Sequence, residues 1–182
     1  FRKTDAWSIF AAHRFELGSF ALTPIARYEA MDFDRLNRLT GVAGTASIDR
    51  FLPGLGATWR ANDTTTLFAG VHRGFAPPRV EDVIGGAGTL TDVDAEKSPN
   101  NEIGVRTDLM QGVSIQAALF RQDFDNLIAV GSIAGGGTPL SQGEAVFEGA
   151  ELGFYGRFSG GFRARLAYTN LFTARQSTPL VN

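Results

Sequence analysis

The sequence predicts an all-β fold, an antiparallel transmembrane β-barrel segment of about eight strands from a larger barrel. Apolar and polar residues alternate with a period of two in several long stretches, which is the pattern of strands with two unlike faces. Short links between these stretches alternate with long polar segments, as turns and loops do at the two ends of a membrane barrel. The 182 residues include 22 glycines and 15 phenylalanines, a composition that favours an all-β protein with many tight turns.

The predicted strands follow from this alternation, which is clearest in residues 101–109. There Ile103 and Val105 share one face of the strand, whereas Glu102 and Arg106 share the other. One face is therefore apolar, and the other carries full charges. The same pattern predicts strands at residues 113–122, 150–157 and 162–169, and more weakly at residues 7–17, 19–33, 51–60 and 65–75.

The connections between the predicted strands are of two kinds. Short links are expected at Gly18 and residues 62–63, 110–112 and 159–161, and long ones at residues 34–50, 76–99 and 131–145. Because outer-membrane barrels have short periplasmic turns and long extracellular loops, this order favours such a barrel. Strand length agrees, since the strand that begins at residue 113 is expected to continue to residue 130, beyond the about 9–11 residues that cross a bilayer.

Two other all-β architectures would show similar patterns. A soluble β-sandwich also alternates apolar and polar residues, although its strands are usually about five or six residues long. A β-propeller has repeats close in length to the hairpins predicted here. A propeller blade, however, has four short strands and often a recurrent Trp-Asp pair, neither of which the sequence contains.

The stretch LFAGVHRGFAPPRVEDV, residues 67–83, shows how one predicted strand ends. Gly74 permits a bend, and Phe75 is expected at the membrane interface, where aromatic side chains are enriched. Pro77 and Pro78 cannot donate backbone hydrogen bonds, so they should end the pairing of this strand. The loop beyond, residues 79–99, is then expected at the cell surface, lining the entrance for a ligand.

Composition excludes several classes of function. The 17 Lys and Arg residues against 19 Asp and Glu give a net charge of −2, so no basic surface for nucleic acid is expected. The absence of cysteine excludes disulfides, thiolate metal sites and cysteine nucleophiles. No apolar run approaches the about 18 residues of a transmembrane helix. The chain has no signal peptide and both ends fall within structured-looking sequence, which predicts a fragment.

No catalytic or metal site is predicted, and we do not expect an enzyme. His13 and His72 stand alone without the spacing of metal ligands. Asp92, Asp94 and Glu96 lack the glycine and distal glutamate of an EF-hand loop. These carboxylates are better interpreted as a solvated loop surface.

Four arginines near the predicted long loops are the candidate ligand-binding residues. Arg35, Arg38 and Arg50 lie in or beside the first long loop, and Arg79 begins the second. A guanidinium group pairs bidentately with carboxylates or phosphates, which suits an anionic ligand. The alternatives are ordinary solvated loop residues or outward arginines that contact lipopolysaccharide phosphates.

Several segments together resemble the TonB-dependent outer-membrane receptors, within them the siderophore and ferric-citrate receptor group. Each segment resembles a strand motif of that family, and they occur in the expected order. They are FLPGLGATWRAND (51–63), LFAGVHRGFAPPRVEDV (67–83), EKSPNNEIGVR (96–106), AALFRQDFDNLIAV (117–130) and FEGAELGFYGRF (147–158). The flanks, residues 1–50 and 159–182, resemble the family only in general pattern.

The resemblance implies a Gram-negative outer-membrane receptor that imports a ferric siderophore or ferric citrate, with energy relayed by TonB. It implies a barrel of 22 strands around a plug, in contact with outer-membrane lipid. Residues 1–182 would then be a partial barrel domain, with the plug and the C-terminal strands outside this chain. Iron would travel within its chelate, so no cofactor is expected. The alternatives are a passive porin-like channel or surface-binding barrel, and a soluble all-β binding module.

Overall fold

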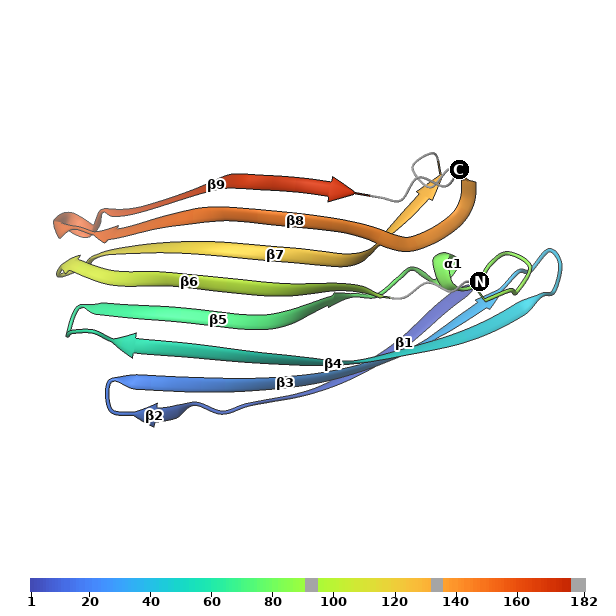
Figure 1. Ribbon diagram of the computed structural model, residues 1–182, viewed down its shortest axis with the longest axis horizontal. Coiled ribbons are helices and arrows are strands. Elements are labelled where there is room, and N and C mark those ends of the chain that lie inside the picture. The colour runs from blue at the N-terminus through green and yellow to red at the C-terminus, as the bar shows by residue number, and fades with distance from the viewer. Residues whose placement is uncertain (91–94, 132–135, 178–182) are drawn as a thin grey trace.

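The computed structural model describes residues 1–90, 95–131 and 136–177, which form one antiparallel sheet with almost no helix (Figure 1). The strands are β1 (Arg2–Ala12), β2 (Phe15–Leu17), β3 (Phe20–Leu36), β4 (Ala43–Arg60), β5 (Thr65–Ala76), β6 (Glu96–Met110), β7 (Val113–Gly131), β8 (Gly136–Arg157) and β9 (Arg163–Ser177). A short helix, α1 (Val80–Val83), follows β5, and a 3₁₀ turn, η1 (Ser159–Gly161), precedes β9. In these ranges no helix is long and apolar enough to cross a membrane.

The strands form a meander in which sequence neighbours pair. Their order is β1-β3-β4-β5-β6-β7-β8-β9, and β2 pairs with β3 beyond the end of β1. The short turns all lie at one end of the sheet, here called the turn end, and α1 and the other links lie at the opposite loop end (Figure 1). The prediction of an antiparallel barrel segment is confirmed. The sheet is not closed, and β1 and β9 form its two edges, so this chain is part of a barrel wall.

Two of the three predicted long loops are wrong. β3 continues to Leu36 and β4 begins at Ala43, so most of the expected loop 34–50 is strand. Likewise β8 begins at Gly136, within the expected loop 131–145. The sequence signal failed because strands that rise above the bilayer need no apolar outer face. The link after β5 is long, as predicted, and β5 ends at Ala76, directly before the two prolines.

Prolines account for the irregular places in the ladder. The carbonyl of Pro24 accepts a hydrogen bond from the His13 amide at 3.3 Å, so the backbone of Pro24 faces β1 and β2. Proline has no N–H to return that bond, and the predicted single strand 7–17 accordingly breaks at His13 and Arg14, between β1 and β2.

Pro53 sets the point at which β4 and β5 separate. Alternate residues of a strand present their backbone groups to opposite neighbours, which places the nitrogen of Pro53 toward β5. The pairing of β4 with β5 ends at Gly54 and His72, one residue before Pro53. Beyond this point β4 stays paired with β3 while β5 stays paired with β6, and the two halves of the wall diverge toward the loop end (Figure 1).

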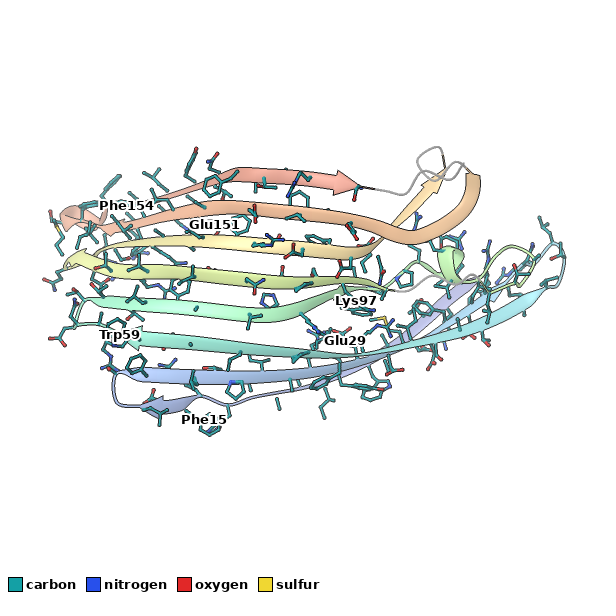
Figure 2. All side chains as sticks on the ribbon, in the orientation of Figure 1. Phe15, Glu29, Trp59, Lys97, Glu151 and Phe154 are labelled. Atoms are coloured by element: carbon teal, nitrogen blue, oxygen red, sulfur yellow. The ribbon has the colours of Figure 1, made fainter. Side chains whose placement is uncertain are left out.

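The two faces of the sheet differ as the sequence predicts. Leu119, Leu152 and Leu166 lie on one face, with 55%, 50% and 69% of their surfaces exposed. Glu102, Glu151 and Arg165 lie on the other face, which we call the lumen face because charged side chains face the interior of a membrane barrel. Figure 2 shows the side chains along the strands of this single layer.

Aromatic pairs border the apolar face at two heights. Phe20 and Trp59 stack at 5.6 Å near the turn end, and Trp7 packs on Tyr28 at 5.4 Å nearer the loop end. Phe20 and Tyr28 are about 27 Å apart along β3 at about 3.4 Å per residue. This spacing is close to the height of the lipid-facing band of a membrane barrel, about 25 Å, with aromatic girdles at both interfaces.

On the lumen face, two phenylalanines lie flat over glycines of the neighbouring strand. Phe120 pairs directly with Gly149, where an added Cβ would lie 2.7 Å from the ring. Phe68 covers Gly104 in the same way. The glycines therefore let large rings lie against the wall, which keeps this part of the lumen face smooth.

Candidate functional site

The loop after β5 folds back onto the lumen face at the loop end. Val80, Val83 and Ile84 form an apolar cluster with Phe33 of β3, and Ile84 has no exposed surface. Met31, Ala46 and Ile48 pack against this cluster from β3 and β4. The loop thus covers the upper lumen face with a small core of its own, and polar side chains surround it.

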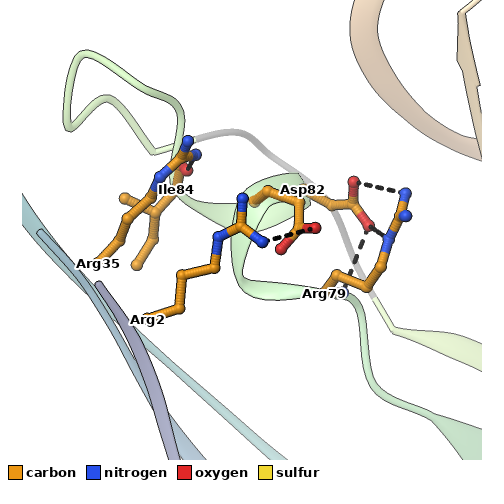
Figure 3. A network of polar contacts seen from close by, with 6 residues as sticks. Arg2, Arg35, Arg79, Asp82 and Ile84 are labelled. Carbon is orange, nitrogen blue, oxygen red and sulfur yellow. Dashed lines mark hydrogen bonds and ion pairs between the residues drawn. The ribbon is translucent and has the colours of Figure 1, made fainter. Parts of the chain in front are cut away.

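Two arginines that face each other across β1 and β3 are held by this loop (Figure 3). Arg2 pairs directly with Arg35 in the strand register, and like charges in such positions repel. Arg2 forms an ion pair with Glu81 at 3.3 Å, and the NH1 group of Arg35 donates a hydrogen bond to the carbonyl of Ile84. The loop therefore supplies a carboxylate and a carbonyl at the place where the two strands need negative charge.

Arg79 stabilises the start of α1 itself. Its Nε and NH2 groups donate to the two carboxylate oxygens of Asp82 at 2.9 and 3.2 Å, a bidentate pair (Figure 3). Asp82 is buried, and also accepts from the backbone amide of Arg79 at 3.3 Å. These hydrogen bonds and the charge of Asp82 raise the pKa of Arg79 above its ordinary value. The predicted ligand-binding side chain is thus engaged by its own loop.

The other two candidate arginines lie in different surroundings. Arg38 is exposed in the link between β3 and β4, with its guanidinium carbon 5.8 Å from the centre of the Phe1 ring. Arg50 lies within β4 opposite Glu29 on the lumen face, and its NH1 group donates to the carbonyl of Asp49 at 2.6 Å. Figure 2 places Glu29 on the loop-end side of Trp59.

A shallow hollow of about 230 Å³ brings three arginines together at the loop end. This loop-end hollow is lined by Phe1, Arg2, Arg35, Leu36, Asn37 and Arg38. The structure therefore brings Arg35 and Arg38 to one hollow, whereas Arg50 and Arg79 do not line it. With two of its arginines held by the loop, the hollow offers Arg38 as the guanidinium most available to an anion.

Sequence reasoning missed Arg2 and Glu81, because their proximity depends on strand register. Arg2 and Glu81 are 79 positions apart in the chain, and nothing in the local pattern of either residue predicts a partner. Only the β1–β3 register, which sets Arg2 opposite Arg35, brings both arginines beneath the loop. Within the described ranges, no group of three or more His, Asp or Glu side chains is placed to hold a metal ion.

Comparison with protein families gives one match over the whole chain. The family model described as "TonB dependent receptor-like, beta-barrel" matches residues 1–182. The match covers the flanks, residues 1–50 and 159–182, in which the sequence motifs were weakest.

Several solved structures have the same arrangement of strands. The pyoverdine receptor FpvA from Pseudomonas aeruginosa superimposes with a TM-score of 0.78 at 19% identity, over 97% of this chain and 26% of that protein. The ferric citrate transporter FecA gives 0.73 at 21% identity over 93% and 26%. The copper transporter OprC gives 0.66 at 15% identity over 91% and 29%. This chain therefore spans only about a quarter to a third of these proteins, and the likeness establishes the fold.

Proposed function

Since this chain belongs to the TonB-dependent receptor β-barrel family of the Gram-negative outer membrane, we propose that its protein takes up an anionic ferric chelate. Receptors of this family serve siderophore and iron uptake. The finer assignment is a carboxylate-rich chelate such as ferric citrate, with iron as cargo within its ligand and with import energised through TonB. The remaining barrel strands and a plug would lie in parts of the protein outside this chain.

The arginine-lined hollow at the loop end is the observation that supports an anionic cargo. Arg2, Arg35 and Arg38 converge there, and Arg2 and Arg35 lie on the lumen face of β1 and β3. The loop holds Arg2 and Arg35, so Arg38 is the guanidinium that can pair bidentately with a carboxylate of the chelate. Among these residues Arg38 is the proposed contact, and Arg35 is proposed to act by holding the loop.

Ligand binding by the full-length receptor tests the chelate. We expect purified receptor to bind ferric citrate more tightly than a neutral ferric hydroxamate in isothermal titration. Arg38→Gln should weaken ferric citrate binding about 10- to 100-fold, because a hydrogen bond to a charged group contributes about 1.5–3 kcal/mol. Arg14→Gln is the control, since Arg14 is also exposed but lies toward the turn end, where it pairs with Glu16 at 3.1 Å. Equal affinity of wild type and Arg38→Gln would remove Arg38 from the site.

Energy coupling is tested separately by uptake of radiolabelled ferric citrate into cells. A TonB-dependent receptor should give no accumulation in cells that lack TonB, although surface binding continues. Accumulation without TonB would instead identify the passive, porin-like alternative.

A further inference from the structure

Two neighbouring carboxylates of α1 have different kinds of partner. The Asp82 side chain is 5% exposed, and both of its oxygens accept from Arg79, which does not line the loop-end hollow. The Glu81 side chain is 31% exposed, and its ion pair at 3.3 Å is with Arg2, which lines the hollow. Asp82 is therefore part of the loop structure, whereas Glu81 occupies a cation of the hollow through an exposed contact.

The loop has other anchors at the same place, so it does not depend on Glu81. The apolar cluster around Ile84 is buried against β3. The NH1 group of Arg35 donates to the carbonyl of Ile84, and Nδ2 of Asn37 donates to the carbonyl of Gly86 at 3.4 Å. Burial of apolar side chains stabilises a fold more than one exposed ion pair does. The contact between Glu81 and Arg2 is thus free to serve a purpose other than holding the loop.

The effect of Glu81 on the hollow follows from the position of Arg2. Arg2 stands directly opposite Arg35 and lines the hollow together with Arg38, and its side chain is 56% exposed. Without Glu81, the hollow would offer the guanidinium of Arg2 beside that of Arg38, and each could pair with a carboxylate. With Glu81 in place, Arg2 has its carboxylate already, and the negative charge of Glu81 repels an approaching anion.

We propose that Glu81 is a specificity-determining residue of the loop-end hollow, which withholds Arg2 from the ligand and so lowers the affinity for polycarboxylates. This inference rests on the proposed function, because the ligand is the same anionic chelate that Arg38 contacts. The wild-type hollow then holds the chelate through the one guanidinium of Arg38. Weaker binding at the surface suits a transported ligand, since a ligand that is bound too tightly leaves its site slowly.

Isothermal titration of the full-length receptor with ferric citrate tests this role. Glu81→Gln should raise the affinity about two- to fivefold, the fold-change expected when a competing exposed ion pair is lost. The affinity for a neutral ferric hydroxamate should not change. Arg2→Gln, added to Glu81→Gln, should remove the gain, because Arg2 is the cation that Glu81 releases. No gain in Glu81→Gln, or a gain that persists without Arg2, would overturn the proposal.

Asp34→Asn is the matched control for the change of charge. Asp34 precedes Arg35 in β3 and pairs with Lys3 of β1 on the face opposite to that of Arg2 and Arg35. The control removes one negative charge near the hollow without releasing Arg2, so ferric citrate should bind as to wild type. An equal gain in Asp34→Asn would overturn the proposal, since net charge alone would then explain the effect.

Hydrogen exchange of residues 77–90 separates this role from a purely structural one. In Glu81→Gln the exchange should stay close to that of wild type, because the apolar cluster still holds the loop. Faster exchange together with weaker ferric citrate binding would overturn the proposal and make Glu81 a support of the loop.

Citrate without iron distinguishes a failure of this inference from a failure of the proposed cargo. If ferric citrate does not bind, but Glu81→Gln binds citrate more tightly than wild type and only while Arg2 is present, the cargo is wrong and the role of Glu81 stands. If ferric citrate binds through Arg38 and Glu81→Gln brings no gain, the proposed function stands and the role of Glu81 is wrong.

Discussion

The loop end and the turn end of this wall both carry arginines on the lumen face, but they use them differently. At the loop end, Arg2, Arg35 and Arg79 each have a partner in the loop that packs on β3. At the turn end, Arg163 and Arg165 have no ion pair within the described part of the chain. The number of arginines on a surface therefore does not identify a binding site. Partnered cations hold structure, so only a cation without a partner is a candidate contact for a ligand.

The largest effect that this comparison predicts is at the centre of the loop core. Ile84 is fully buried in the apolar cluster, so Ile84→Asp would place a charge without a partner there, at a cost of about 3–5 kcal/mol. We expect the loop to detach while the barrel stays folded. Hydrogen exchange of residues 77–90 in the full-length receptor should rise strongly.

Leu90→Asp is the matched control for this change. Leu90 belongs to the same loop but is 65% exposed, so its replacement should change stability by less than about 0.5 kcal/mol. Unchanged exchange in Ile84→Asp would show that the loop is not held by its apolar cluster.

A pair of glycines offers a second contrast between the two ends. A Cβ at Gly44 would lie 2.6 Å from the Ile84 side chain, whereas one at Gly153 would meet nothing closer than 3.9 Å. Gly44→Ala should therefore destabilise the packed loop by about 1–3 kcal/mol. Gly153→Ala should be neutral or stabilising by up to about 1 kcal/mol, because alanine loses less backbone entropy in a strand.

Amide exchange of the loop measures the first change, and thermal melting of the receptor in detergent measures the second. If both alanine variants behaved alike, the contrast between the packed loop end around Gly44 and the unpacked surface around Gly153 would be lost.

The sequence predicted the faces of the strands better than their ends, for a physical reason. Where β4 crosses the lipid band, Leu55 and Trp59 alternate with small or polar residues, and the pattern is strong. Beyond Phe51 the next outward residues are polar, as at Asp49 and Ser47. Above the bilayer, both faces of a strand meet water, so the apolar alternation that marks a strand disappears although backbone pairing continues.

The site was harder to predict than the fold, because it depends on contacts between distant segments. Arg35 and Arg79 were predicted as ligand contacts because they are arginines and because they lie in or beside expected long loops. Their partners, Ile84 and Asp82, become apparent only when the loop is seen folded onto β3. Arg165 was overlooked because it stands in a predicted strand, and nothing in the local pattern shows whether an arginine there forms an ion pair.

The smallest predicted effect compares one arginine from each end. Arg35→Met keeps the aliphatic stem but leaves the carbonyl of Ile84 without its donor, which should cost about 1–2 kcal/mol in loop stability. Relief of the repulsion between Arg35 and Arg2 returns only about 0.2–1 kcal/mol, so a net loss is expected. Arg165→Met removes no ion pair and lessens the repulsion around Arg163, so receptor stability should stay within about 0.5 kcal/mol of wild type. Hydrogen exchange of residues 80–84 measures the loss of loop stability in Arg35→Met. Thermal melting in detergent measures the stability of the Arg165→Met receptor. A loss of stability in Arg165→Met as large as that in Arg35→Met would mean that the turn-end arginines also hold structure.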